Sequence, residues 1–148
     1  MKLSEHFELG DMCFSQTAIR KGIDNTVTPE ALFALEALCK KVLEPLVAKG
    51  MMFSINSGFR CVELNKAIGG AANSQHCKGE AADLRPKDIS VEQFYQEIIK
   101  SGVPFDQIIQ EFDNWVHVSY KAEPRRQKLR AQKKDGKTIY IPDGVQYK

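Results

Sequence analysis

Two histidines and an aspartate have the residue types and the spacing for metal chemistry in this chain. His76 and Asp83 are seven positions apart in a stretch rich in small residues, and His117 follows on an apolar run. Two neutral imidazoles and one carboxylate are typical of a catalytic zinc site, which has three protein ligands and an open fourth position. The chain's third histidine, His6, is near the N-terminus. We therefore expect one zinc ion per chain, held by His76, Asp83 and His117.

Four cysteines, at positions 13, 39, 61 and 77, leave two alternatives open. Cys77 directly follows His76 and could serve as a metal ligand. However, adjacent residues of an extended segment point to opposite faces, which favours Asp83. A nucleophilic pair of histidine with Cys61 or Cys77 is the second alternative, but no protease signature surrounds either thiol. No C-x-x-C spacing is present, and without a signal peptide we expect reduced thiols rather than a disulfide framework.

The wider arrangement of motifs is similar to that of a known family. Five residues match the string S-x-H-x-x-G-x-A-x-D: Ser74, His76, Gly79, Ala81 and Asp83. The segment 57–60 precedes this string and 115–117 follows it, in the expected order. The chain thus resembles the zinc D-alanyl-D-alanine carboxypeptidase family, which includes cell-wall dipeptidases and phage endolysins. Residues 105–120 look most like a compact branch often encoded by phages and prophages, and the resemblance covers about residues 4–120.

This resemblance implies both a fold and an activity. The fold would be α+β, a single small domain with a mostly antiparallel sheet flanked by helices, of the D-Ala-D-Ala carboxypeptidase or hedgehog-like type. The activity would be zinc-dependent hydrolysis of a peptide bond in peptidoglycan stem peptides that contain D-amino acids, as a D,D-carboxypeptidase or an endopeptidase. The bond that is cut does not follow from these residues. A non-catalytic, zinc-containing cell-wall-binding module of the same fold is the alternative.

The resemblance also implies roles for Arg60 and Ser74. The family's matching arginine lies beside the metal and stabilises negative charge on the tetrahedral intermediate, a role that suits the guanidinium fork. A serine at the position of Ser74 lies near the substrate. We therefore expect Arg60 to act in catalysis and in substrate binding, and Ser74 to act in substrate binding.

The general base is harder to assign. Related enzymes usually carry Glu or Asp three residues before the second metal histidine, where this chain has Asn114, and an amide cannot accept the proton. Glu111 and Asp113 are the nearby carboxylates. Glu111 lies in an apolar run, where burial raises the pKa of a carboxylate toward the range useful for acid–base catalysis. We predict Glu111 as the base and Asp113 as the second choice.

Periodicity and turn residues predict the elements that position these side chains. Helices are expected over 31–48, 62–68 and 91–100, and strands over 51–57, 81–84, 107–112 and 115–120. The last two strands should be antiparallel and joined by the tight turn Asp113–Asn114. We expect residues 1–148 to form a single peptidase-like domain. Within it, 121–148 would be a basic C-terminal extension or a hairpin about Asp135–Gly136.

Composition narrows the partners and the location. The chain of 148 residues has a net charge of +2, and no apolar run in it approaches the ~20 residues that span a bilayer. Six cations between 125 and 134 could bind nucleic acid, but no aromatic stacking pattern accompanies them. We expect a monomer that binds peptidoglycan peptide, with no nucleic acid and no membrane insertion. Without a signal peptide it would be synthesised in the cytoplasm, and it would reach the cell wall by lysis, a holin or virion delivery.

Overall fold

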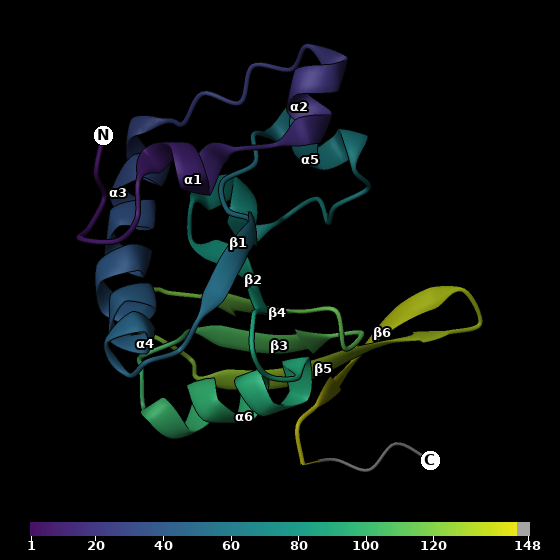
Figure 1. The fold of residues 1–148 in the computed structure, drawn as a ribbon. Coiled ribbons are helices and arrows are strands. Elements are labelled where there is room, and N and C mark those ends of the chain that lie inside the picture. Colours follow the sequence, from purple (N-terminus) through teal and green to yellow (C-terminus); the bar gives the residue numbers. More distant parts are fainter. Residues whose placement is uncertain (145–148) are drawn as a thin grey trace.

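A six-stranded β-sheet forms the centre of the computed structural model, which describes residues 1–144 (Figure 1). The strands are β1 Phe53–Ser57, β2 Ala81–Pro86, β3 Gln107–Glu111, β4 Trp115–Ser119, β5 Gln127–Lys134 and β6 Lys137–Pro142. Their order in the sheet is β1-β2-β4-β3-β5-β6. Every neighbouring pair is antiparallel except β3 and β5, which run parallel. The predicted α+β fold with a mostly antiparallel sheet is confirmed.

The helices come mostly before and between the strands. They are α1 Leu9–Cys13, α2 Gln16–Lys21, α3 Pro29–Leu38, α4 Glu44–Ala48, α5 Val62–Ala67 and α6 Val91–Ser101. A 3₁₀ turn, Gln75–Lys78, precedes β2. The short helices α1 and α2 were not predicted from the sequence. Within residues 1–144, no helix has both the length and the apolar character needed to cross a membrane.

The predicted helix over 31–48 is continuous in space but changes its hydrogen bonding part of the way along. A π-helical turn, Cys39–Leu43, joins α3 to α4, and the backbone N–H of Glu44 donates to the carbonyl of Cys39. Pro45 has no N–H, and its ring would clash with the carbonyl four residues earlier in a regular α-helix. Widening the preceding turn accommodates the proline without ending the helix.

The sheet separates apolar side chains from polar ones by the alternation of each strand. Leu84 on β2 and Val116 and Val118 on β4 are fully buried in the main core with residues of α3, α4 and α6. Asp83 and His117, at the intervening positions, project from the opposite face. Asp83 pairs with His117 in the register of β2 and β4. The same register that buries the core therefore places two of the predicted ligands side by side.

The turn between β3 and β4 differs by one residue from the prediction. Phe112 and Asp113, rather than Asp113 and Asn114, have positive φ angles, of 59° and 57°. The backbone N–H of Asn114 donates to the carbonyl of Glu111 at 2.9 Å. Two consecutive left-handed residues match the right-handed twist of the strands, as in a type I′ turn. Glu111 is thus the last residue of β3 and pairs with Trp115.

Residues 127–142 form a hairpin, β5–β6, that extends the sheet beyond β3 (Figure 1). It turns at Asp135 and Gly136, both with positive φ. Three arginines attach it: Arg125 to Asp106, Arg126 to the carbonyl of Val103, and Arg130 to Glu92 and Asp143. Half of the basic residues between 125 and 134 are therefore used in docking the hairpin. Residues 145–148 of the predicted extension 121–148 lie outside the described residues.

Gly79 allows the 3₁₀ turn to pack against α3. Its φ is 74°, and a Cβ at this position would overlap the backbone carbonyl of Ala31. Gly69 has a similar φ of 77° with open space around it. Gly69→Ala should cost about 1–2 kcal/mol of unfolding free energy for the left-handed conformation alone. Gly79→Ala should cost about 1–3 kcal/mol more, because the new methyl group forces the backbone apart.

Urea unfolding of the two variants measures this difference directly. Equal losses of unfolding free energy in the Gly79→Ala and Gly69→Ala proteins would contradict the close packing of the turn on α3.

Candidate metal centre

Three buried side chains from separate elements meet on the face of the sheet opposite the main core. His76 comes from the 3₁₀ turn, Asp83 from β2 and His117 from β4. One ligand atom of each lies within 4.8 Å of the others. The structure therefore brings together the three residues that the sequence predicts as zinc ligands. Asp83 lies beside a bulge, where the register of β1 on β2 shifts between Ile55 and Ser57.

The hydrogen bonds of the outer ring nitrogens fix the tautomers of both histidines. His76 Nδ1 lies 2.7 Å from the carbonyl oxygen of Gly58, which can only accept, so Nδ1 carries a proton. His117 Nε2 lies 3.1 Å from Oε1 of Gln75. The amide nitrogen of Gln75 in turn donates to Asp106 Oδ2 at 3.0 Å, which orients the amide oxygen toward His117. His117 Nε2 is therefore also a donor.

The inner ring nitrogens are consequently free to accept. His76 Nε2 lies 3.3 Å and His117 Nδ1 3.2 Å from Asp83 Oδ1. With both outer nitrogens protonated, neutral rings would direct two lone pairs at a carboxylate oxygen, an arrangement that needs a cation or an added proton. Ligand atoms about 2.1 Å from a tetrahedral zinc ion lie about 3.4 Å from each other, close to the distances found here. The three residues thus fit zinc in chemistry and in spacing.

The carboxylate of Asp83 is ionised in this setting. Burial alone would raise its pKa, but the positive charge that this arrangement requires, on protonated His76 and His117 or on a bound cation, outweighs burial and holds the pKa below its ordinary value. A buried carboxylate without such partners would be costly. Asp83 is therefore available as an anionic ligand.

A second group of side chains supports His117 from behind. Asp106 is fully buried, and Arg125 donates to it from its backbone N–H, Nε and Nη2 at 2.8–3.0 Å. Burial favours the protonated form of Asp106, but the hydrogen bonds from Arg125 and Gln75 outweigh it and lower the pKa to about 2. The contacts Arg125–Asp106–Gln75–His117 thus link the orientation of the His117 ring to the segment that leads into the hairpin. The sequence analysis did not identify Gln75, although it directly precedes His76.

Cys77 lies outside the ligand group for a different reason from the predicted one. Residues 75–78 form a 3₁₀ turn and not an extended segment, so the argument from alternating faces is wrong here. The half-buried thiol of Cys77 does not belong to the group formed by His76, Asp83 and His117. Burial raises its pKa, which keeps the thiol protonated and a poor ligand.

A groove of about 880 Å³ opens over the three ligands, and Arg60, Ser74 and Glu111 also line it. Burial, reinforced by the negative charge of Asp83, raises the pKa of Glu111 to about 7. The indole Nε1 of Trp115 donates to Glu111 Oε2 at 3.1 Å and orients the carboxylate. Ser74 Oγ accepts from the backbone N–H of His76 at 3.1 Å and so caps the 3₁₀ turn. Arg60 Nε is buried and has no hydrogen-bond partner among residues 1–144.

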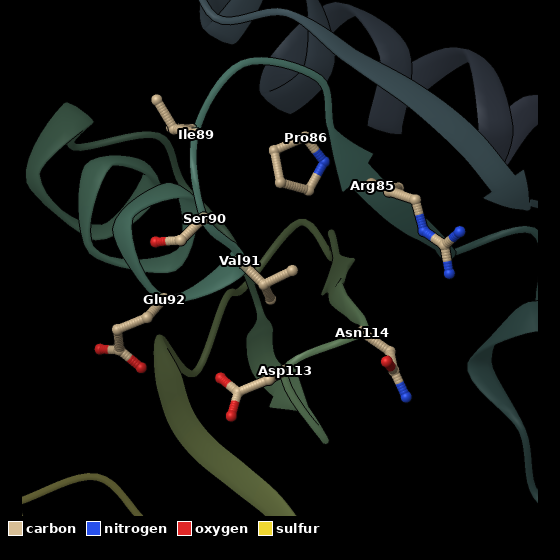
Figure 2. A pocket seen from close by; sticks show the side chains of 8 residues that line it. All are labelled: Arg85, Pro86, Ile89, Ser90, Val91, Glu92, Asp113 and Asn114. Atoms are coloured by element: carbon tan, nitrogen blue, oxygen red, sulfur yellow. The ribbon is translucent and has the colours of Figure 1, made fainter.

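Asp113 and Asn114 line a different hollow, of about 560 Å³, with Arg85 and the start of α6 (Figure 2). The carboxylate of Asp113 accepts a hydrogen bond from the side chain of Gln110. Gln110 also donates to Glu92 on α6, so it belongs to the helix-covered face of the sheet. The structure therefore separates the two carboxylates considered as base, with Glu111 in the groove and Asp113 outside its lining.

Comparison with known protein families shows a match over most of the chain. The family model described as peptidase M15 matches residues 5–119, a range that includes His76, Asp83, His117 and Glu111. The match ends at the last residue of β4, so β5 and β6 lie beyond it. No curated protein matches the chain.

Replacement of either histidine should remove the metal. We expect one zinc ion per chain in the purified protein, and little or none in His76→Ala and His117→Ala, because each loses one of three ligands. Elemental analysis of the dialysed proteins measures this. His6→Ala is the matched control: His6 lies with Glu5 and Glu44 in an exposed group that could also hold a metal, and its loss should leave zinc content unchanged if the ion is bound in the buried site. Full zinc content in both site variants would show that the ion binds elsewhere.

Gln75 should affect zinc affinity without being a ligand. Gln75→Leu removes the acceptor for His117 Nε2–H, and losing such a supporting hydrogen bond typically costs about 10–100-fold in metal affinity. Competition with a chromophoric chelator measures the affinity. Gln132→Leu makes the same change at an exposed position of β5 and should have no effect. Equal zinc affinities in the wild type and Gln75→Leu would show that Gln75 does not support metal binding by His117.

Proposed function

Because the chain belongs to the peptidase M15 family, whose peptidases are zinc-dependent and act on peptidoglycan peptides, we propose that it hydrolyses a peptide bond in peptidoglycan stem peptides. The reaction would be of the D,D-carboxypeptidase or endopeptidase type. The observation that carries the proposal is the convergence of three acceptor atoms, from His76, Asp83 and His117, in the floor of a groove. We further propose that the protein acts as a monomer after release by lysis, a holin or virion delivery, as for an endolysin of phage or prophage type.

The proposed ligands supply the Lewis acid. Zinc held by His76, Asp83 and His117 would polarise the scissile carbonyl and lower the pKa of the attacking water. His76 and His117 keep their outer nitrogens protonated through Gly58 and Gln75, so that their inner nitrogens remain ligands. The protein thus fixes the ligand set before the substrate arrives.

Glu111 is the proposed general base. Its pKa of about 7, raised by burial and by Asp83, lets it take a proton from the attacking water and return it to the leaving amine near neutral pH. Trp115 holds one carboxylate oxygen and leaves the other free for the proton transfer. Asp113 is the less suitable candidate, because its carboxylate is engaged by Gln110 and lines the other hollow.

Arg60 is the proposed oxyanion-stabilising residue. Its guanidinium is largely buried, which lowers its pKa, and Asp83 and Glu111 are among the groups whose negative charge favours the cation. Its side chain lines the groove that contains the proposed metal site, which brings guanidinium donors within reach of a bound substrate. A preorganised donor aimed at developing negative charge contributes more to rate than to ground-state binding. We propose Ser74, at the rim of the same groove, as a substrate-binding residue.

The groove fits an anionic peptide. Within residues 1–144, five basic side chains line it against two acidic ones, Asp83 and Glu111, which are both assigned to the chemistry; of the five, Arg125 is already paired with Asp106. The basic residues are Arg60, Lys78, Lys121, Arg125 and Lys133. Such an imbalance favours substrates that carry free carboxylates, as stem peptides do.

Incubation with purified sacculi of several wall chemistries tests the activity. We expect soluble peptide fragments, loss of activity with a chelator and recovery with zinc, and mass spectrometry of the fragments identifies the bond. His117→Ala is the control for contaminating hydrolases. Sacculi that stay intact but bind the zinc-loaded protein would instead support a non-catalytic cell-wall-binding module.

Glu111→Gln should separate the base from the ligands. The amide keeps the size and hydrogen bonding of the side chain but cannot accept a proton, so turnover should fall by about 10²–10⁴-fold while zinc is retained. Asp113→Asn is the matched control and should stay within a few-fold of wild type. If Asp113→Asn were inactive and Glu111→Gln remained active, Asp113 would be the base instead of Glu111.

The pH profile of the wild type gives a second test of Glu111. The base works only when ionised, so kcat/KM should rise with pH through its pKa. That pKa is about 7 without a bound cation, and positive charge at the ligands lowers it, which places the acid limb at or below pH 7. If the residual activity of Glu111→Gln showed the same acid limb as the wild type, the assignment of Glu111 as the base would be contradicted.

A further inference from the structure

The hairpin β5–β6 forms part of the groove that contains the proposed metal site. Gln127, Leu129, Lys133, Thr138 and Tyr140 all line the same groove as His76, Asp83 and His117. None of these five hairpin residues lies within the segment 5–119 that matches the family model. The family match therefore accounts for the ligand end of the groove but not for its far end.

The sheet register explains why these side chains face the groove. Ile109 pairs with both His117 and Leu129, and Glu111 pairs with Trp115 and Ala131. Paired residues of neighbouring strands project from the same face. Ala131 is opposite Tyr140, and Lys133 is opposite Thr138, so the face that begins at Asp83 continues to the last strand.

The far end of the groove is anchored rather than loosely attached. Arg130 makes hydrogen bonds at 2.6 and 2.9 Å to both oxygens of Glu92 on α6, and a third at 3.1 Å to Asp143. Bidentate pairing of this kind fixes geometry as well as charge. Arg130 is at an alternate position of β5 from Leu129 and Ala131, so the hairpin is attached on one face and open on the other.

The open face combines an apolar floor with a polar end. Ile109, Leu129 and Ala131 form a small buried apolar cluster, against which Phe112 packs. Beyond it, Lys133 Nζ lies 5.3 Å from the centre of the Phe112 ring and donates to Thr138 Oγ1 at 3.0 Å. Lys133 has two further ammonium protons, and Tyr140, which is 56% exposed, has a hydroxyl that can donate. The polar end therefore offers donors and positive charge to an anion.

We propose that this face of the hairpin, with Leu129, Lys133 and Tyr140, is a substrate subsite that binds a free carboxylate of the peptide a few residues from the scissile bond. The proposal rests on the proposed peptidase function, since it assigns a part of the same substrate. Tyr140 on β6 is three strand spacings from His117 on β4 and two residues further along the sheet, which is about 16 Å at ~4.8 Å per spacing and ~3.4 Å per residue. The extended chain from a D-Ala–D-Ala bond to the α-carboxylate of D-Glu covers ~12 Å, and the long side chains of Lys133 and Tyr140 can cover the remainder. The subsite thus selects longer stem peptides over terminal dipeptides.

Two synthetic peptides test the subsite. One is L-Ala–γ-D-Glu–L-Lys–D-Ala–D-Ala with a free α-carboxylate on its D-Glu residue, and the other is its α-amide. Dissociation constants are measured on the zinc-loaded full chain in a Glu111→Gln background, and mass spectrometry checks that the peptides stay intact. We expect the background protein to prefer the carboxylate by about tenfold, as for a hydrogen bond to a charged group.

Lys133→Gln should abolish this preference, whereas Lys128→Gln should retain it. Lys128 is exposed on the same strand at an alternate position, and its loss changes the net charge equally. Three results would each overturn the subsite. They are a preference retained in Lys133→Gln, a preference lost equally in both variants, and no preference in the background protein. Failure of the wild type to cleave either peptide or sacculi would count against the peptidase function alone, because the binding comparison needs no turnover.

Discussion

The site depends on a conflict between three acceptor atoms that face one another. Asp83 Oδ1 lies within 3.3 Å of one nitrogen from each of two histidines, and both histidines already use their other nitrogen as a donor. In a buried setting, lone pairs directed at a carboxylate oxygen are unfavourable without positive charge between them. A zinc ion held by the three side chains would resolve the conflict, because a catalytic zinc site has three protein ligands. The groove, the proposed base and the proposed oxyanion donor are all arranged around this point.

The sheet makes that arrangement possible because its two faces have different tasks. Positions 84, 116 and 118 bury apolar side chains against the helices, and the positions between them present ligands to the groove. Glycines then allow the third ligand to approach. Gly58 supplies the carbonyl that holds His76, and it packs so closely on the backbone of Met12 that a side chain would not fit. The packing that stabilises the fold therefore also sets the distances between ligands.

Residue types and spacing were sufficient to predict which three side chains meet at the site and most of the elements that carry them. His76, Asp83 and His117 stood out because few histidines were available, and the alternation around His117 predicted its strand. The network behind His117 could not be predicted in the same way, because Gln75, Asp106 and Arg125 are 31 and 19 residues apart and meet only through tertiary packing. The choice between Glu111 and Asp113 depended on one residue of turn register, which sequence patterns define poorly. The parallel pairing of β3 with β5 likewise needed the structure, because nothing local in the basic segment indicates its partner strand.

The ring nitrogens that bind the metal provide the most direct test of this account. Long-range ¹H–¹⁵N correlation spectra of the zinc-loaded protein distinguish metal-bound from protonated imidazole nitrogens for each histidine. The hydrogen bonds to Gly58 and Gln75 predict zinc on Nε2 of His76 and on Nδ1 of His117, with protons on the opposite nitrogens. Zinc bound through Nε2 of both rings, or spectra of His76 and His117 unchanged by zinc, would contradict the account.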